Sequence, residues 1–499
     1  MRISVSDIYD YYRPSVCELR LYLIYNEPTA PRELTELEEL LMDMGQEHER
    51  GRLEEYLADP RVQVTDIEAV EEEQRAKVTV EALHAGPGVL YQALLEGKAI
   101  IDGVEYELVG RPDFMIVEDG GDLVIEEAKI AKNIDMKSHP EIILQVQLYG
   151  WLLEKMTGVR PSSLRVFNSE RDLVEVPPAG EEELLAALED IVRSITAEEE
   201  PYAPVSYSSC MSCGFGDYCW ENAVARRDVA LLPRLDKGLA RELRGMGIIS
   251  VDDLVERMDE QSLSELKRPY GKGLRKVGKL TESIIPLAKA LAEEREVVAG
   301  SLELPESPNY VMFDLEGLPP HLEGPPVYLW GMQVFGKEPS EYISALAGFG
   351  EDGDRAGWED FLSKASDILA RYGDIPFVHW ATYEKTKLRD YMERFGDDSN
   401  GTAARVAENL FDLLPATRSF IALPIPSYSL KVIEEYVGFN RTIECKGDKS
   451  IAMYLTAIRI GDEAERQRII DEILAYNRED LEATWAVLQW LIRKSSGQS

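Results

Sequence analysis

The sequence predicts an α/β protein that is divided into several domains. Helical and β-strand patterns alternate over residues 1–220, and a similar alternation begins again at residue 309. Between these stretches, residues 228–297 are rich in Leu, Lys and Arg and have a helical pattern, and two prolines in residues 303–309 mark a boundary. A chain of 499 residues is also too long for one hydrophobic core. We therefore expect three units, covering residues 1–220, 228–297 and 305–495.

The composition does not exclude nucleic acid as a substrate, although the chain is acidic. The formal net charge is −38, and a polyanion repels phosphates. At physiological salt, however, the field of a charge decays within about 8 Å, and divalent cations held by carboxylates reverse the local sign. The sequence contains no run of ~18 apolar residues, so it predicts no membrane span. Residues 1–15 lack a basic segment followed by an apolar one, so we expect a cytoplasmic protein with reduced thiols.

The first unit begins with helical patterns that include residues 45–59 (GQEHERGRLEEYLAD). Three short β patterns follow, VEYELVG, FMIVED and DLVIEEAKI, and then a further helical stretch, LQVQLYGWLLEK. This order of helices and strands, αβββαβ when the next strand is included, predicts a mixed sheet flanked by helices.

The last two of these strands carry a candidate metal site. Asp113 follows a Gly-Arg-Pro turn at the start of one strand. Glu127 and Lys129 are two residues apart on the next strand, so their side chains leave the same face. Two adjacent carboxylates are unfavourable unless a cation neutralises them, and Mg²⁺ and Mn²⁺ prefer such oxygen ligands. The lysine would then orient an attacking water or help to deprotonate it.

Three further residues belong to the same candidate site. Gln145 and Tyr149 lie one helical turn apart and share a face, so both can reach one phosphate or base. His48, in the upstream helix, offers an imidazole to the metal. All six residues also have ordinary alternatives: a surface ion pair for E-x-K, a turn role for Asp113, packing for the Gln–Tyr pair, and a capping or surface role for His48.

Four of the five cysteines form an unusual pattern. Cys210, Cys213 and Cys219 form C-x2-C-x5-C, and Cys17 lies almost two hundred residues upstream. In a reducing compartment, clustered cysteines indicate a metal–thiolate site, and four thiolates can hold either zinc or an iron–sulfur cluster. Such a site would fasten the two ends of the first unit together. Cys445 has no clustered partner and is expected to be an ordinary thiol.

The order His, G-x-x-D, E-x-K and Q-x3-Y resembles the RecB-type branch of the PD-(D/E)XK nucleases. One cysteine before the core and C-x2-C-x5-C after it resemble the iron–sulfur members of that branch, including the CRISPR-associated ones. The resemblance covers residues 1–220 and implies a restriction-endonuclease-like fold. It implies metal binding by His48, Asp113 and Glu127 and a catalytic lysine at Lys129. It also implies a [4Fe–4S] cluster, with Zn²⁺ as the alternative, on Cys17, Cys210, Cys213 and Cys219.

The middle segment contains a basic patch, which consists of Lys267, Arg268, Lys272, Arg275, Lys276 and Lys279. Residues 273–279 fit the G-x4-G-K start of a phosphate-binding loop. However, Leu280 stands where Ser or Thr is required and no buried strand precedes the motif, so a nucleotide-driven motor is excluded. Just upstream, RELRGMGIISVDDLVERM resembles a helix-hairpin-helix module, in which turn amides contact nucleic-acid phosphates. A plain helical linker is the alternative.

A second acidic constellation lies in the third unit. Asp314 and Glu316 alternate on an apolar strand and point to the same side, which is unfavourable without a metal. Glu384 follows a later strand, and Tyr476 and Asp480 lie one turn apart on a C-terminal helix. In the ordinary alternatives, D-x-E is a solvated strand edge and Y-x3-D is a helix surface.

This constellation resembles the DEDDy exonucleases of the ribonuclease-H-like fold over residues 309–495, and SYSLKVIEEYVGF between the motifs is also similar to that family. The resemblance implies that four carboxylates hold two metals and that Tyr476 orients the attacking water. One position departs from the family, which usually has Asp where this chain has Glu384, with an Asn a few residues before it. Asp412 is either a substitute ligand or a helix cap.

Together, the resemblances imply a metal-dependent DNA nuclease with two hydrolytic centres. The first centre would cut single-stranded DNA or process ends, and the second would remove nucleotides from 3′ ends. A role in DNA repair, recombination or defence follows from the resemblance alone. Whether a helicase is a partner is left open by the resemblance. Two other functions are also open: an RNA-processing exonuclease, and a nucleic-acid-binding adaptor with a degenerate C-terminal domain.

Overall fold

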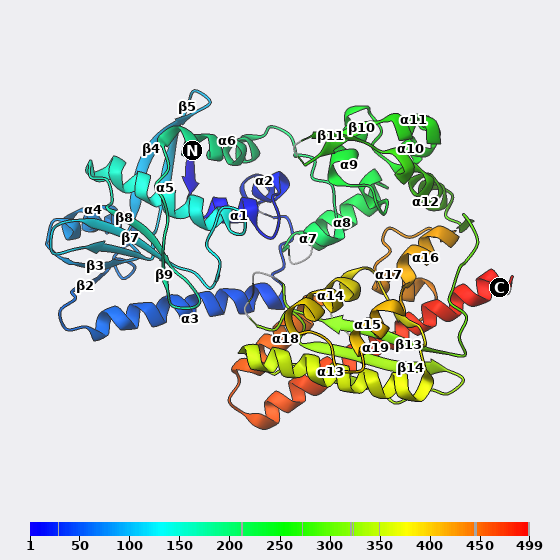
Figure 1. Cartoon of the computed structure of the whole chain (residues 1–499). Helices are drawn as coiled ribbons and strands as arrows, with labels where there is room; N and C mark the ends of the chain where they lie inside the picture. Colours follow the sequence, from blue (N-terminus) through cyan, green and yellow to red (C-terminus); the bar gives the residue numbers. More distant parts are fainter. Residues whose placement is uncertain are drawn as a thin grey trace. The chain divides into compact units, whose positions relative to one another are not determined.

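The computed structural model of the chain describes residues 1–27, 29–210, 213–271, 273–319, 322, 324–348, 350–443 and 447–497. Two sequence predictions concern residues outside these ranges, the basic-patch member Lys272 and the lone cysteine Cys445. The chain divides into two compact units, whose elements are labelled in Figure 1. The body of unit 1 is Met1–Ala203 with Ser209–Tyr218, and the body of unit 2 is Cys219–Pro320 with Gly324–Ser499.

Unit 1 contains two sheets. One has the strand order β2-β3-β6-β7-β8-β9, with bounds Val64–Asp66, Gly88–Tyr91, Phe114–Val117, Leu123–Ala128, Ser163–Phe167 and Leu173–Glu175. The other has the order β1-β5-β4, with bounds Arg2–Ser4, Val104–Gly110 and Leu95–Ile101. The predicted strands correspond to β5, β6 and β7, but β5 lies in the smaller sheet, away from the β6–β7 hairpin.

Helix α5 (Pro140–Thr157) packs against both sheets, because it is apolar on nearly every side. Gly97 on β4 admits Leu152 of the helix, and Gly150 of the helix admits Leu164 on β8; a Cβ at either glycine would approach the leucine to within 2.9 Å. The helix also forms the crossover between the parallel strands β7 and β8. Its C-terminal half is therefore fixed in place beside the β6–β7 hairpin.

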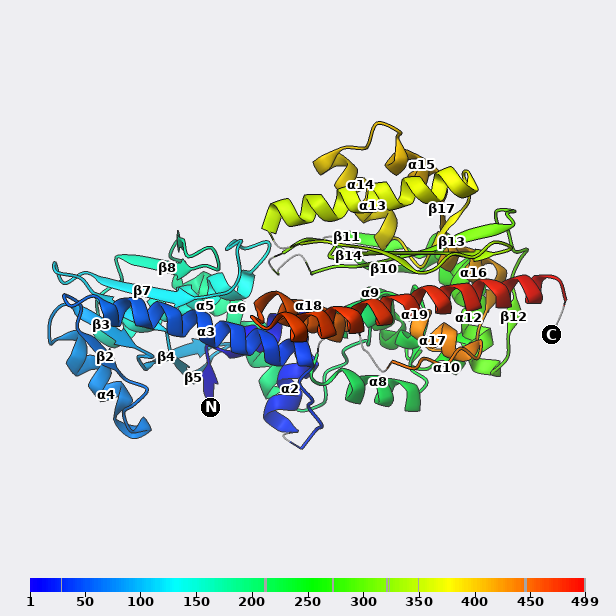
Figure 2. The same cartoon turned by 90° about the horizontal axis from the view of Figure 1, so that it is seen from below.

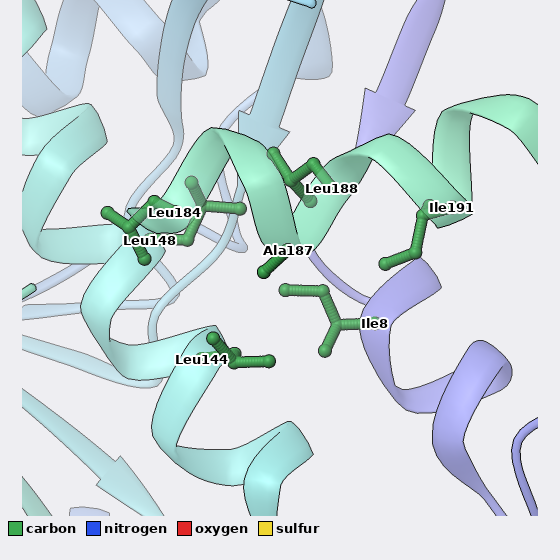
Figure 3. A pocket seen from close by; sticks show the side chains of 7 residues that line it. All are labelled: Ile8, Leu144, Leu148, Leu184, Ala187, Leu188 and Ile191. Carbon is green, nitrogen blue, oxygen red and sulfur yellow. The ribbon is translucent and has the colours of Figure 1, made fainter. Parts of the chain in front are cut away.

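Helix α3 (Glu36–Ala58) contains the predicted helix of residues 45–59 and begins with a capping box between Thr35 and Glu38. Unit 1 also contains the helices α1 (Asp7–Tyr12), α2 (Glu18–Asn26), α4 (Glu72–Leu83) and α6 (Glu181–Thr196). Helices α1, α5 and α6 enclose a cavity of about 10 Å³ (Figure 3). It is lined only by apolar side chains, so it is a packing defect of the core and not a ligand site.

Unit 2 begins with a mainly helical part. Its helices are α9 (Lys237–Gly245), α10 (Val251–Arg257), α11 (Glu260–Glu265) and α12 (Thr281–Glu293). The segment predicted as helical also contains an antiparallel hairpin of β10 (Lys267–Tyr270) and β11 (Gly273–Lys276). The physical reason is local: Pro269 cannot continue a helix, and Gly271 takes a positive φ of 58° at the turn.

The rest of unit 2 is built around a five-stranded sheet of order β15-β14-β13-β16-β17. The bounds are Ile343–Leu346, Leu329–Gly336, Asn309–Glu316, Phe377–His379 and Leu410–Asp412. The central strand β13 pairs antiparallel with β14 and parallel with β16. Helix α13 (Gly350–Tyr372) covers one face and α19 (Glu463–Ser495) the other (Figure 2). Stacked rings of Phe313, Trp330 and Phe361 fill the core beneath α13.

Among the described residues, no helix is both long and apolar enough to cross a bilayer.

Candidate functional site

Asp113, Glu127 and Lys129 meet at one end of the β6–β7 hairpin in unit 1. The amide of Asp113 donates to Glu127 Oε2 (3.1 Å), and the amide of Ala128 donates to Asp113 Oδ2 (2.9 Å). Lys129 Nζ donates to Glu127 Oε1 (2.9 Å). Two backbone hydrogen bonds and one ion pair therefore hold two buried carboxylates side by side, which is the arrangement that a cation site requires.

The pKa values in this centre follow from burial and charge. Burial raises the pKa of Asp113, and the carboxylate of Glu127 raises it further. Burial also raises the pKa of Glu127, although Lys129 opposes the rise. Burial lowers the pKa of Lys129, but the two carboxylates outweigh it, and the net pKa is above the ordinary value. The lysine is therefore an ammonium that neutralises part of the acidic centre.

Helix α3 contributes Glu49 to this centre, a residue that sequence reasoning missed. Gln92 Nε2 donates to Glu49 Oε1 (2.6 Å) and to Asp113 Oδ1 (2.9 Å), so one amide joins both carboxylates. Gln92 itself has a positive φ of 54°, which is uncommon away from glycine and is found at functional sites. The sequence signal for Glu49 is only its position next to His48, which does not show which of the two faces the carboxylates.

His48 packs against Phe167. The two rings are stacked with their centroids 5.0 Å apart, and His48 Nε2 lies 3.2 Å from the Phe167 carbonyl oxygen. Because a carbonyl can only accept, Nε2 carries a proton in this arrangement, and metal binding by His48 would require Nδ1. The same carbonyl accepts from the amide of Lys129 (2.9 Å), so His48 supports the backbone that presents the lysine.

Gln145 and Tyr149 share one face of α5 and contact each other. Gln145 Nε2 donates to the Tyr149 hydroxyl (3.1 Å), and Tyr149 is buried. Burial, and after it the charges of Glu127 and Asp113, raises the pKa of Tyr149. Gly110 makes room for the ring, because a Cβ there would lie 2.6 Å from Tyr149 Cε1. Tyr149 is thus a neutral hydroxyl within electrostatic range of the acidic centre.

Asp314, Glu316 and Asp480 form a second acidic centre in unit 2. The first two alternate along the central strand β13, and Asp480 comes from α19. One carboxylate oxygen from each of the three residues lies within 4.8 Å of the other two. Among the described residues, this is the one group of three His, Cys, Asp or Glu side chains that lie so close together. Burial, and then Asp480, raises the pKa of Glu316 to about 8, and burial raises the pKa of Asp480 to about 6. Three carboxylates this close favour a bound cation.

Helix α19 and strand β14 orient Asp314. Asn477 Nδ2 donates to Asp314 Oδ2 (2.7 Å), and Tyr342 OH donates to Asn477 Oδ1 (2.9 Å). Gly331 on β14 is required here, since a Cβ at that position would overlap the Asn477 amide. None of these three supporting residues was identified from the sequence, because their spacing follows no motif.

Helix α18 (Gly447–Arg459) and strand β14 orient Glu316. Ser450 Oγ (3.0 Å) and Tyr328 OH (3.4 Å) both donate to Glu316 Oε2. The Tyr328 ring stacks on Tyr454 of α18, with the centroids 4.2 Å apart. Two hydroxyls therefore fix one oxygen of Glu316.

Arg441 is the cation of this second centre, and it too was missed. Its guanidinium donates to Asp480 Oδ1 and binds both oxygens of Glu434, one of them at 2.8 Å. It also lies 5.5 Å from the centroid of the Tyr476 ring. Its Nη1 is buried and has no hydrogen-bond partner in the described part of the chain. Arg441 therefore compensates Asp480 directly, and the more distant charge of Lys431 opposes the rise in the pKa of Asp480 and of Glu316.

Tyr476 lies on α19, one turn before Asp480. Burial, and then the charge of Asp480, raises the pKa of Tyr476, so its phenol is neutral and can orient a water but not act as a base. Beside it lies a groove of about 490 Å³, which is large enough for a nucleotide. The groove is lined by Thr442, Ile443, Lys449, Met453, Arg468, Asp471, Glu472, Ala475 and Tyr476.

Glu384, the predicted fourth carboxylate, is not a member of the three-carboxylate group. It is buried in the first turn of α14 (Tyr383–Phe395), and its Oε2 lies 3.2 Å from His379 Nδ1. Burial is the largest cause of the raised pKa of Asp314, followed by the charges of Asp480, Glu316 and then Glu384. Glu384 therefore lies within electrostatic range of Asp314. The structure thus assembles three of the four predicted ligands and pairs the fourth with a histidine.

Asp412 acts as a helix cap. Its Oδ1 accepts from the amide of Leu414 (3.1 Å) at the start of α16 (Leu413–Phe420) and from the amide of Ala381 (3.0 Å). Ala381 has a positive φ of 72°, so this cap also holds the strained loop that precedes Glu384. Of the two alternatives for Asp412, the structure therefore shows the cap.

Cys210, Cys213 and Cys219 lie near the unit boundary in sequence, Cys17 lies far upstream, and none of the four forms a disulfide. Cys17 is the residue before α2, and the Ser15 hydroxyl donates to the carbonyl of Ser209 (2.7 Å), beside Cys210. Cys213 closes a turn through its amide to the Cys210 carbonyl (3.2 Å). The hydrogen bond from Ser15 to Ser209 therefore joins the segments that contain Cys17 and Cys210 within unit 1. Cys219 lies on α8 (Gly216–Ala225), at the point of that helix where unit 2 begins.

The basic patch divides into two kinds of residue. Arg268 is buried and forms an ion pair with Asp236 (2.5 Å), and Lys276 forms an ion pair with Glu265. The side chains that are exposed and make no ion pair with any described residue are Lys267, Arg275 and Lys279. The patch is therefore smaller than the sequence suggested, because one of its cations stabilises the fold and another is paired.

The turn between α9 and α10 does not present free amides. The amides of Met246, Gly247 and Ile248 donate to carbonyls of α9, and those of Ile249 and Ser250 donate to Asp253 Oδ2. The helix-turn-helix arrangement of the resemblance is present, but phosphate binding by its turn amides is not supported, because each amide already has an acceptor.

Comparison with known protein families finds two matches. Residues 17–220 match the family model of the PD-(D/E)XK nuclease superfamily, and residues 311–492 match that of the RNase_H superfamily. No curated protein matches the chain. A solved structure described as "Crystal structure of SSO0001" is 17% identical, covers 44% of this chain and 85% of its own, and has a TM-score of 0.25. On the two family matches, residues 17–220 are a PD-(D/E)XK nuclease superfamily domain, residues 311–492 are an RNase_H superfamily domain, and the chain is a phosphodiester-hydrolysing nuclease.

Proposed function

We propose that the chain is a metal-dependent DNA nuclease with two hydrolytic centres. The observation that carries the proposal is the convergence of Asp314, Glu316 and Asp480 within 4.8 Å in an RNase_H superfamily domain. The centre at Asp113 and Glu127 supports it with a second pair of buried carboxylates. From the family resemblance, the first centre cuts single strands or processes ends, and the second removes nucleotides from 3′ ends, in DNA repair, recombination or defence.

The donor sets of both centres are oxygen-rich and fit Mg²⁺ or Mn²⁺, which would polarise the scissile phosphate and favour ionisation of a water. Asp314, Glu316 and Asp480 would hold the metal in unit 2, and Asp113 and Glu127 would hold it in unit 1, assisted by Glu49 or His48. The side chains around them have separate tasks. The neutral phenol of Tyr476 orients the attacking water, Asn477 fixes Asp314, and the Lys129 ammonium faces the phosphate, with Gln145 and Tyr149 as neutral hydrogen-bonding groups.

We further propose that Cys17, Cys210, Cys213 and Cys219 hold a [4Fe–4S] cluster. The hydrogen bond from Ser15 to Ser209 supports this, because it joins the segment before Cys17 to the segment before Cys210. Four thiolates are a suitable donor set for iron–sulfur and for zinc. Iron and acid-labile sulfide measured after anaerobic purification test the proposal, and a colourless protein that contains zinc would contradict it.

Nuclease assays on end-labelled strands test the proposed function. Wild-type protein with Mn²⁺ should degrade single-stranded DNA, and EDTA should stop the reaction. Labels at the 5′ and 3′ ends in separate reactions distinguish stepwise 3′ trimming from internal cuts. RNA of equal length serves as the competing substrate, and preferential cleavage of RNA would overturn the DNA assignment. Anaerobic protein that cuts neither DNA nor RNA would contradict the proposal as a whole.

A further inference from the structure

The hairpin β10–β11 in unit 2 exposes side chains that a folded protein normally covers. Tyr270 retains 55% of its surface and Leu274 retains 70%, the highest value among the exposed large apolar residues described. Seven of the eight strand residues are exposed, and the exception is Arg268. Because a two-stranded hairpin is at best marginally stable in isolation, its hold on the rest of the fold has to be explained.

Two contacts hold the hairpin on helix α9. The Arg268 guanidinium forms a buried ion pair with Asp236, the residue that also caps α9 by accepting from the Leu239 amide (2.9 Å). Gly238 in the first turn lies against the Pro269 carbonyl, where a Cβ would come within 2.5 Å of the oxygen. The buried ion pair and the close backbone contact therefore hold the hairpin on α9. The exposed side chains of the hairpin are not needed for this attachment.

The pairing register places the aromatic and basic groups together. Arg268 pairs with Arg275, and Tyr270 pairs with Gly273, so these residues share one face of the hairpin. The Arg275 guanidinium lies 4.9 Å from the centroid of the Tyr270 ring. Gly273, opposite the tyrosine, has no side chain to cover the ring. The buried Arg268 guanidinium also lies 5.5 Å from this centroid, so this face presents an exposed aromatic ring with two guanidinium groups against it.

The charge of the hairpin is opposite to that of the chain. Residues 266–281 contain six basic residues and no acidic one, although the chain has a net charge of −38. Lys267, Arg275 and Lys279 are exposed and form no ion pair with described residues. An exposed aromatic group combined with unpaired cations fits single-stranded nucleic acid, which offers stacking bases and a phosphate backbone. A purely apolar partner would leave the cations without a counter-charge.

We propose that the β10–β11 hairpin is a docking surface for single-stranded DNA, on which Tyr270 and Arg275 stack against a base and Lys267 and Lys279 attract the phosphates. The proposal rests on the proposed nuclease function and deepens it, since it assigns substrate capture to a surface separate from both acidic centres. The hairpin, and not the turn between α9 and α10, is then the nucleic-acid contact of this part of the chain, because the amides of that turn already have acceptors.

Fluorescence anisotropy with a labelled single strand, measured in EDTA to prevent cleavage, tests the proposal. The Tyr270→Ala/Arg275→Ala protein should bind at least about fivefold more weakly than wild type, the lower limit for loss of one stacked base. Tyr270→Phe should restore most of the affinity, because it keeps the ring. Lys279→Ala alone should reduce the slope of log affinity against log salt by about 0.7, as expected for one lost phosphate contact to a single strand.

A second exposed hairpin provides the matched control. Strand β4 of the β4–β5 hairpin also exposes an apolar residue, Ile100, and a lysine, Lys98, but Lys98 forms an ion pair with Glu105 and acidic residues flank it. Lys98→Ala/Ile100→Ala should bind DNA as the wild type does. All variants should keep the wild-type melting temperature, since the altered side chains are exposed.

Three outcomes would overturn the proposal. Wild-type affinity of Tyr270→Ala/Arg275→Ala for single strands would show that the hairpin is not a DNA surface, and binding of another protein would then be the remaining explanation for its exposed groups. An equal loss in the Lys98→Ala/Ile100→Ala control would show that the effect is not specific. A loss confined to RNA of the same length would contradict the choice of DNA. If wild-type protein with Mn²⁺ neither cuts nor binds nucleic acid, the proposed function itself fails, which is a different result.

Discussion

The two acidic centres differ in how they neutralise their own charge. In the centre of unit 1, Lys129 binds Glu127, and backbone amides donate to both carboxylates, so much of the compensation is built into the chain. In the centre of unit 2, Arg441 binds Asp480, whereas the hydrogen bonds to Asp314 and Glu316 from described residues come from neutral donors, and Lys431 acts on Glu316 only from a distance. The difference indicates that the second centre depends more on added cations, while the first is partly preassembled without them.

The largest effect is expected from the loss of a carboxylate in the second centre. Asp480→Asn should reduce 3′ trimming by at least about a thousandfold, because metal-assisted charge stabilisation supplies several kcal/mol. Cleavage by the first centre should remain. End-labelled strands in Mn²⁺ measure both activities, and Glu482→Gln on the same helix is the control. Unchanged trimming by Asp480→Asn would show that unit 2 is not the source of the activity.

The next largest effect is expected when the two adjacent carboxylates on β7, Glu126 and Glu127, are replaced one at a time. Glu126 is fully buried and accepts from Arg52 (2.7 Å), Arg165 (2.8 Å) and Tyr56 (2.9 Å). Glu126→Ala should therefore reduce the free energy of unfolding by about 3–5 kcal/mol, since it leaves the Arg165 guanidinium without its carboxylate partner and Arg52 with Glu55 as its one acidic partner among the described residues. Glu127→Gln should abolish cleavage by the first centre without a comparable loss of stability. Chemical denaturation and the nuclease assay together measure this, and equal destabilisation by both changes would refute the distinction.

The position of these residues was accessible from the sequence to different degrees. Glu127 and Lys129, like Asp314 and Glu316, could be found because each pair has the period of two that places both side chains on one face of a strand. Asp113 could be found because it completes the order of the family motif. Glu49 and Arg441 could not be found, because a single charged residue on a helix or in a loop carries no periodic signal. Both depend on tertiary contacts that bring distant segments together.

The β10–β11 hairpin shows a different limit of sequence reasoning. Its strands have four residues each and contain charges, glycine and proline in place of the alternating apolar residues that identify strands. The same composition predicted a helical linker with a basic patch. The pairing register places Arg268, Tyr270 and Arg275 on one face, and only burial shows that Arg268 is covered while the other two side chains stay exposed.

A smaller effect is expected at Tyr476. Tyr476→Phe removes the hydroxyl that orients the attacking water but keeps the ring beside Arg441, so 3′ trimming should fall by about tenfold to a hundredfold. The corresponding change in unit 1, Tyr149→Phe, should affect internal cleavage in the same direction. The rates are measured at saturating Mn²⁺, where a loss of metal affinity does not contribute. A wild-type rate in Tyr476→Phe would remove the hydroxyl from the mechanism.

The smallest effect concerns pH and the stability of the metal-free protein. A carboxyl whose pKa is higher in the folded than in the unfolded state binds its proton more tightly when folded, so folding is favoured at low pH. The pKa of Glu316 is raised to about 8 by burial and by Asp480. The melting temperature in EDTA should therefore fall by a few degrees as the pH rises from about 5 to about 8. Glu316→Gln should flatten this dependence, and an identical slope in wild type and variant would contradict it.

The central claim is that buried carboxylates in each unit form a site for divalent cations. Anomalous diffraction from crystals grown with Mn²⁺ tests it most directly. The account predicts one anomalous peak or more among Asp314, Glu316 and Asp480, and another beside Asp113 and Glu127. The absence of manganese from both centres at concentrations that support cleavage would contradict the account.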